Sequence, residues 1–158
     1  MRNLFKIKNP ENQRGVAAVE FAIVLPLLLF LFIGITEFGL AYYNKQVLTN
    51  AAREGARVGI ISGTDVDKIK ETIKNYVVFE DENNNKKSRL ITFGPNTFLD
   101  NQAYKNNITV SNPDADNHRT IKVEFSYTYL ILQGFNFFGA NFGPNLNISS
   151  STVMKMEP

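Results

Sequence analysis

The chain has 158 residues and contains no cysteine and a single histidine, His118. Without cysteine there is no disulfide to stabilise an exported domain, no thiol nucleophile and no thiolate metal site. One histidine cannot build a zinc site, and the sequence has neither a Gly-x-Ser-x-Gly motif nor a phosphate-binding glycine loop. The sequence therefore supports neither an enzyme nor a cofactor-binding protein.

One group of polar side chains could contact a cation. Asp114, Asp116 and His118 alternate along the chain. However, the glycine and the distal glutamate of a calcium-binding loop are missing around them. We therefore expect this segment to be a solvated turn.

The basic residues are concentrated at the N-terminus. The first fifteen residues hold 4 of the 17 basic and 1 of the 15 acidic residues, so 13 basic and 14 acidic residues remain after them. The formal charge accordingly falls from +2 for the whole chain to −1 without this leader. This balance gives no basic surface for nucleic acid.

A long apolar segment follows the basic leader. No charged residue occurs between Glu20 and Glu37, and the apolar stretch exceeds the roughly 20 residues that cross a bilayer. Pro26 is expected to kink this helix, and Tyr42 and Tyr43 are suited to an interfacial anchor. We expect a cytoplasmic leader at 1–15, a transmembrane helix at 16–43 and an extracytoplasmic domain at 44–158. Basic flanks stay in the cytoplasm, which sets this orientation.

A cleavable secretory signal is the alternative interpretation of this segment. Gly39-Leu40-Ala41 satisfies a small-x-small cleavage rule, which would leave Tyr42 as the new N-terminus. The apolar region is nevertheless much longer than the roughly 7–15 residues of such signals. A permanent anchor is favoured for this reason.

Glu20 is the residue of this segment that most needs an explanation. It lies five residues after Gly15, at the start of the apolar run. A charged side chain inside a membrane costs several kcal/mol unless it has a partner, so it indicates a function by default. The alternative is that Glu20 lies in the headgroup layer and reaches water.

Several short motifs between Arg14 and Gly59 carry a family resemblance. They are Gly15-Val16-Ala17-Ala18-Val19-Glu20-Phe21, Leu25-Pro26, Glu37-Phe38-Gly39 and Asn50-Ala51-Ala52-Arg53-Glu54-Gly55-Ala56-Arg57. Together they resemble the TadE-like pseudopilins of tight-adherence (Flp) type IV pilus systems. Phe21 departs from the tyrosine usual in the main pilins of these systems, which favours a minor component.

The resemblance implies a processing site and a set of partners. A prepilin peptidase would cut after Gly15 and leave Val16 as the new N-terminus. In the family's assembly model, Glu20 then pairs with the N-terminal amine of a neighbouring subunit, so Glu20 and Phe21 would belong to the assembly surface. The implied partners are the peptidase, other pilin or pseudopilin subunits, the inner-membrane assembly platform and the lipid bilayer.

Beyond the membrane, the chain is expected to continue as one helix from near Val16 to near Gly59, on the order of 65 Å long. Ala51, Gly55 and Gly59 recur at intervals of four residues and form a stripe that allows close packing. Packing against the chain's own sheet is favoured over packing against another subunit.

The rest of the sequence predicts a small α+β domain. Thr64 is the expected N-cap of a helix over Asp65–Phe79, and the polar residues Glu80–Arg89 are expected to form a loop. Alternating apolar residues predict strands at Leu90–Phe93, Ile108–Val110, Ile121–Tyr129 and Leu146–Met156, with a turn at Asn112–Asn117. The phenylalanine-rich segment 133–144 is expected to fold its rings onto the sheet.

Two functions fit these observations. The first is a minor pilin-like component of a Tad/Flp pilus that acts in pilus assembly and adhesion after cleavage at Gly15. The second is an unprocessed, single-pass binding module that displays its outer domain. Both place the protein in the cytoplasmic membrane, and they differ in the fate of the leader.

Overall fold

The computed structural model describes residues 10–61, 63–100, 102–132, 136–137, 140–141, 143 and 145–157; side chains are described from Gly15 onward, except at 136–137 and 140–141. The chain divides into two compact units, Met1–Thr36 and Glu37–Pro158. The predicted membrane helix ends at Tyr43, inside the second of these units. Each unit is described separately below.

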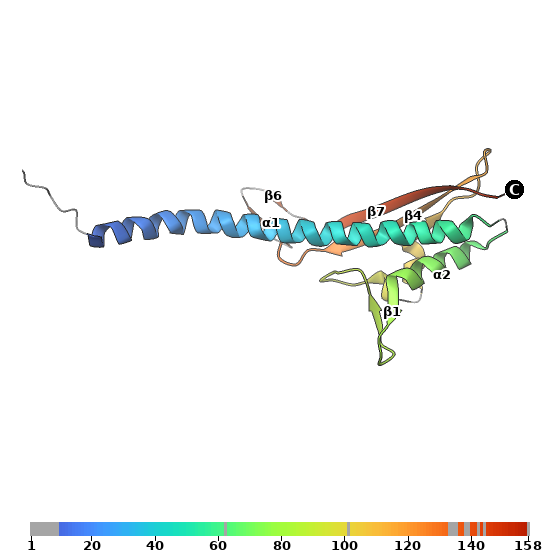
Figure 1. The fold of residues 1–158 in the computed structure, drawn as a ribbon, viewed down its shortest axis with the longest axis horizontal. Coiled ribbons are helices and arrows are strands. Elements are labelled where there is room, and N and C mark those ends of the chain that lie inside the picture. Colours follow the sequence, from blue (N-terminus) through green and yellow to red (C-terminus); the bar gives the residue numbers. More distant parts are fainter. Residues whose placement is uncertain are drawn as a thin grey trace, which may run out of the picture. The chain divides into compact units, whose positions relative to one another are not determined.

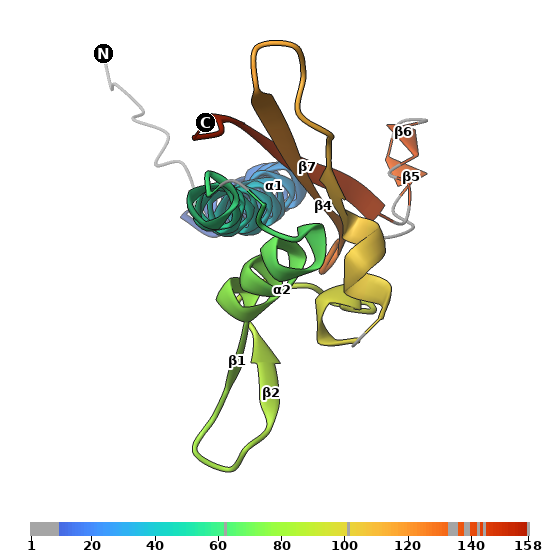
Figure 2. The same ribbon diagram turned by 90° about the vertical axis from the view of Figure 1, so that its right-hand side faces the viewer.

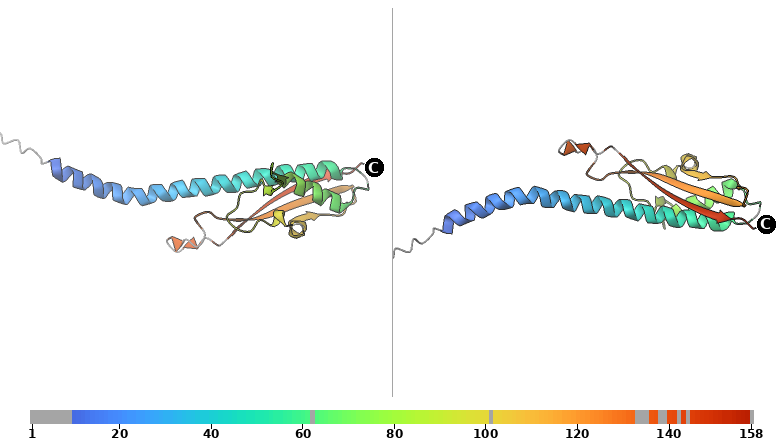
Figure 3. Two further views of the ribbon diagram at one scale, coloured as in Figure 1. Left: turned by 90° about the horizontal axis from the view of Figure 1, so that it is seen from below. Right: turned by 90° about the horizontal axis from the view of Figure 1, so that it is seen from above.

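The first unit consists of the beginning of helix α1, which runs over Pro10–Gly59. The predicted start near Val16 is wrong, because the helix already begins at Pro10. Proline suits a first helical position, where its missing N–H has no intrahelical partner. The helix continues through Pro26, and its blue part curves in both views of Figure 3. Among the described residues, α1 is the single helix long and apolar enough to cross a membrane.

The second unit is an α+β domain, which confirms the predicted fold class. The later part of α1 and helix α2 (Val66–Val77) lie on one side of a three-stranded antiparallel sheet (Figure 2). The sheet has the order β3-β4-β7, formed by Ile108–Val110, His118–Thr128 and Asn145–Lys155. Strands β4 and β7 run beside the later part of α1 (Figure 1).

The core lies between the sheet and the two helices. Alternate residues of β4 face inward, namely Ile121, Val123, Phe125 and Tyr127, as the period-two pattern predicts. They pack with residues of α1 and α2 that are fully buried: Leu48, Ala51, Ala52, Ile69, Ile73 and Val77. Removal of this apolar surface from water is the main stabilising contribution to the domain.

Helix α2 is shorter than predicted. Its N-cap is Asp65 and not Thr64, because the Asp65 side chain accepts a hydrogen bond from the Asp67 amide at 3.3 Å. The Thr64 hydroxyl instead donates to the Val58 carbonyl at 3.3 Å. The helix stops at Val77, where the chain turns into a strand.

The predicted loop at Glu80–Arg89 is in fact part of a β-hairpin. Strands β1 (Val78–Glu80) and β2 (Lys86–Ser88) pair antiparallel and project away from α2 (Figures 1 and 2). Asp81 Oδ1 accepts hydrogen bonds from the amides of Asn83 and Asn85, and Asn84 adopts a φ of 59°. Asparagine tolerates this left-handed conformation, so the polar run closes a turn.

The remaining elements complete the domain. Two short 3₁₀ helices, Thr97–Leu99 and Ala103–Asn107, precede β3, and a small hairpin pairs β5 (Asn136–Phe137) with β6 (Ala140–Asn141). The predicted strand at Leu90–Phe93 is absent from the described sheets. The burial expected for the phenylalanine rings of 133–144 concerns side chains outside the described residues.

Candidate functional site

The predicted processing motif lies on α1 in the first unit. Val16 is 59% exposed, Phe21 is 62% exposed, and Glu20 is also exposed. Val16 and Glu20 are four residues apart and therefore share one helix face, separated by about 6 Å along the axis. A Cβ added at Gly15 would meet no atom within 4 Å. The motif is thus open on the surface of the first unit.

The peptide bond that joins Gly15 and Val16 lies within the helix, because α1 extends from Pro10. A peptidase that binds an extended chain would have to unwind this turn before cleavage. Glycine is less favourable than alanine in a helix by about 1 kcal/mol, so the helix is intrinsically weak at this position.

A buried carboxylate organises the beginning of the second unit. Glu37 is only 4% exposed. Its Oε2 accepts a hydrogen bond from the Tyr127 hydroxyl at 2.6 Å, and its Oε1 accepts from the amides of Ile131 and Leu132 at 2.7 and 3.3 Å. These bonds tie α1 to the end of β4 and the segment after it. Glu37 therefore acts as a structural acceptor for three donors far away in the sequence.

The same contact affects the tyrosine. Burial raises the pKa of the Tyr127 hydroxyl above its usual value, and the hydrogen bond to Glu37 raises it further. Since Tyr127 is fully buried, its hydroxyl depends on this carboxylate as acceptor.

A second polar residue of α1 acts in a similar way. Asn44 is fully buried, and its amide donates to the Ile91 carbonyl at 2.7 Å and accepts from the Ile91 amide at 2.8 Å. This pair of bonds replaces those that a neighbouring strand would supply. In the segment Leu90–Phe93, the N–H and C=O of Ile91 are therefore bonded to a helix side chain and not to a neighbouring strand.

The predicted stripe of small residues faces the interior of the second unit. Ala51 is fully buried, and Gly55 and Gly59 are buried as well. A Cβ added at Gly55 would lie 2.5 Å from Ile73 Cγ1, and one added at Gly59 would lie 2.6 Å from Met154 Cε. The glycines thus let α1 approach α2 and β7 closely.

The polar cluster near His118 is used to close a turn. Asp114 Oδ1 accepts from the amides of Asp116 and His118 at 3.1 and 2.7 Å, and these bonds lower the pKa of Asp114 below its usual value. In the part of the chain that the structure describes, no three His, Asp or Glu side chains are grouped so that they could hold a metal ion.

The roles of Glu37 and Asn44 were not predicted from the sequence. A signal for both is present, since they lie seven residues apart on a helix face that continues through Leu48, Ala51 and Gly55. Two polar residues in such a stripe indicate buried hydrogen-bond partners. Their partners lie about ninety and forty-seven residues away along the chain, so the sequence could not identify them.

Helix α1 is long and apolar enough to cross a membrane, which is consistent with a single-pass anchor for the α+β domain. Residues 15–57 match the family model described as TadE-like protein, which confirms the resemblance found in the sequence. The matched segment begins at Gly15 and ends within α1. TadE-like proteins are a pilus-associated structural family and not an enzymatic one. No curated protein and no solved structure matches the chain.

Proposed function

We propose that this chain is a minor pilin-like component of a Tad/Flp pilus, cleaved by a prepilin peptidase after Gly15, and that it acts in pilus assembly and adhesion. The observation that carries the proposal is the family match over residues 15–57, which starts at the residue where cleavage is expected. The basic leader before it would remain on the cytoplasmic side of the membrane, with the second unit outside.

The exposure of Glu20 supports a role in assembly. Cleavage would create a free amine on Val16, and the Glu20 carboxylate lies on the same helix face. Among the described residues, Glu20 has no hydrogen-bond or ion-pair partner, so its carboxylate is available to another subunit. A desolvated pair between Glu20 and a neighbouring Val16 amine would fix the register of subunits more than it would stabilise them.

The alternative is an unprocessed, single-pass binding module. It is consistent with the anchor and the outer domain, but it gives no role to Gly15. The fate of the leader therefore separates the two functions.

The matched variants Gly15→Val and Gly34→Val test the processing step. Both glycines lie on α1, and an added Cβ at either would meet nothing within 4 Å, so the two changes are equivalent for the fold. Expressed with the cognate peptidase, Gly34→Val should lose the leader and Gly15→Val should retain it. Equal processing of both variants, or of neither, would contradict cleavage at Gly15.

Glu20→Gln tests the assembly role separately. The substitution keeps the size of the side chain and removes its charge. We expect the variant to be processed normally and to support fewer surface pili in sheared fractions. Wild-type pilus yield with Glu20→Gln would show that the charge pair is not used.

A further inference from the structure

The second unit carries a group of exposed apolar side chains around Glu37. We define this group as the apolar rim; its members are Phe38, Tyr42, Phe93, Leu130, Ile131 and Leu146. Each is between 39% and 73% exposed. They come from four segments that are distant in the sequence, so their gathering is a property of the fold.

Contacts within the second unit place these segments together. Glu37 binds the amide of Ile131, and the register of β4 and β7 pairs Tyr127 with Leu146. Phe38, Tyr42 and Leu146 line one shared apolar groove, together with Ala41, Lys45 and residues 147–149. Phe93 is held near by its neighbour Thr92, whose hydroxyl accepts from the Thr128 amide at 3.2 Å.

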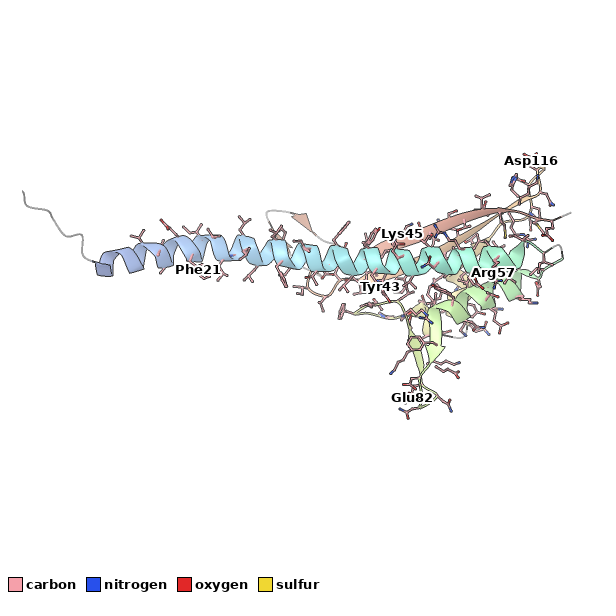
Figure 4. The ribbon with its side chains drawn as sticks, viewed as in Figure 1. Phe21, Tyr43, Lys45, Arg57, Glu82 and Asp116 are labelled. Atoms are coloured by element: carbon pink, nitrogen blue, oxygen red, sulfur yellow. The ribbon has the colours of Figure 1, made fainter. Side chains whose placement is uncertain are left out.

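The segments that form the rim are almost free of charge. Residues 37–158 contain 13 acidic and 13 basic residues. The four segments 38–50, 90–96, 128–132 and 145–151 contain one of them, Lys45, and no carboxylate. Glu37, around which the rim lies, is buried. Exposed charges of the unit lie elsewhere: Figure 4 shows Glu82 at the tip of the β1–β2 hairpin and Asp116 in the turn before β4, both away from Tyr43 and Lys45.

We propose that the apolar rim is seated in the interfacial layer of the lipid bilayer, with Leu130 and Ile131 inserted beside the exit of the helix. Residues 16–36 span about 30 Å as a helix, the thickness of the hydrocarbon core, so the bilayer surface falls at Glu37. The rim is continuous along the chain with this membrane segment. Exposed aromatic residues and a single lysine suit a membrane interface, and Lys45 suits anionic headgroups.

This seating goes beyond the pilus function, since it depends only on the membrane anchor. It also assigns Glu37 a role at the membrane surface. The carboxylate satisfies the amides of Ile131 and Leu132, so the inserted segment brings two fewer unpaired N–H groups into the lipid interface.

Tryptophan scanning tests the proposal, because the chain has no tryptophan of its own. Leu130→Trp and Leu146→Trp place the probe on the rim. Val153→Trp is the control, since Val153 is 61% exposed near the far end of β7. The full chain is reconstituted in vesicles of phosphatidylcholine and phosphatidylglycerol, with and without bromine on the acyl chains.

We expect blue-shifted emission and loss of intensity in brominated lipid for both rim variants, and neither effect for Val153→Trp. Rim variants that behave like Val153→Trp would overturn the proposal. A blue shift that depends on the protein-to-lipid ratio, without quenching by brominated lipid, would also overturn the proposal. It would assign the rim to a contact with a second copy of the chain. The vesicles contain no peptidase and no pilus component, so the result is independent of the processing hypothesis.

Discussion

Removal of the Glu37 carboxylate should destabilise the second unit strongly. In Glu37→Ala three donors lose their acceptor: the Tyr127 hydroxyl and the amides of Ile131 and Leu132. An unsatisfied buried donor costs about 1–3 kcal/mol. Tyr127 and Leu132 are buried, whereas Ile131 is 45% exposed and its amide loses less, so the total is about 2–4 kcal/mol.

Glu37→Gln separates charge from shape. The amide keeps one acceptor oxygen and turns its NH₂ group toward a donor, so a loss of about 1–2 kcal/mol is expected. Glu54→Ala is the matched control, because Glu54 lies on the same helix and contacts only the exposed Arg57 among the described residues. Its removal should leave the free energy of unfolding nearly unchanged.

The assay is guanidinium unfolding of the full chain in detergent micelles, followed by near-ultraviolet circular dichroism. Hydrogen exchange of the peptide that contains Ile131 and Leu132 is measured in parallel. The free energy of unfolding should decrease in the order wild type, Glu54→Ala, Glu37→Gln and Glu37→Ala. Hydrogen exchange of this peptide should be faster in both Glu37 variants. If Glu37→Ala unfolds at the same denaturant concentration as Glu54→Ala, the three hydrogen bonds do not stabilise the fold.

Three further predictions follow from the same packing. Gly55→Ala should destabilise the second unit by about 1–3 kcal/mol, because the added methyl group overpacks against α2. Gly39→Ala, where a Cβ would meet nothing within 4 Å, should not change the stability. Equal melting temperatures of the two variants would refute the close approach of α1 and α2. Asn44→Ala should cost about 1–3 kcal/mol, because it leaves the part-buried N–H and C=O of Ile91 without their partner, while the exposed Asn50→Ala should cost little in the same denaturant titration. Because the pKa of Tyr127 is raised in the folded state, it contributes stability below the unfolded pKa of about 10, and this contribution is lost as the pH rises above that value. The free energy of unfolding, measured at a series of alkaline pH values, should therefore depend less on pH in Tyr127→Phe than in the wild type. An unchanged slope would show that Tyr127 does not cause the pH dependence.

The strands and helices with regular periodicity could be predicted from the sequence. The inward residues of β4 follow a period of two, and Ile69, Ile73 and Val77 of α2 follow a helical period. These patterns arise from local geometry, so they need no knowledge of the partner element.

The other features depend on contacts between distant residues. Leu90–Phe93 has the composition of a strand, but the side chain of Asn44 forms hydrogen bonds with the backbone N–H and C=O of Ile91. The hairpin at Val78–Ser88 is closed by Asp81, whose side chain accepts hydrogen bonds from the backbone amides of the polar turn. Glu37 could be recognised as unusual, yet its donors lie on the end of β4 and in the segment after it, and they could not be named from the sequence.

The most direct test of the central claim is the intact mass of the chain recovered from the membranes of its own cells. The proposed function predicts a mass that corresponds to a chain beginning at Val16, and a full-length mass when the peptidase is deleted. A chain that still begins at Met1 in the presence of the peptidase would contradict the proposal and favour an unprocessed binding module. A chain that begins at Tyr42 would mean an exported protein without an anchor, and would exclude the pilin-like function.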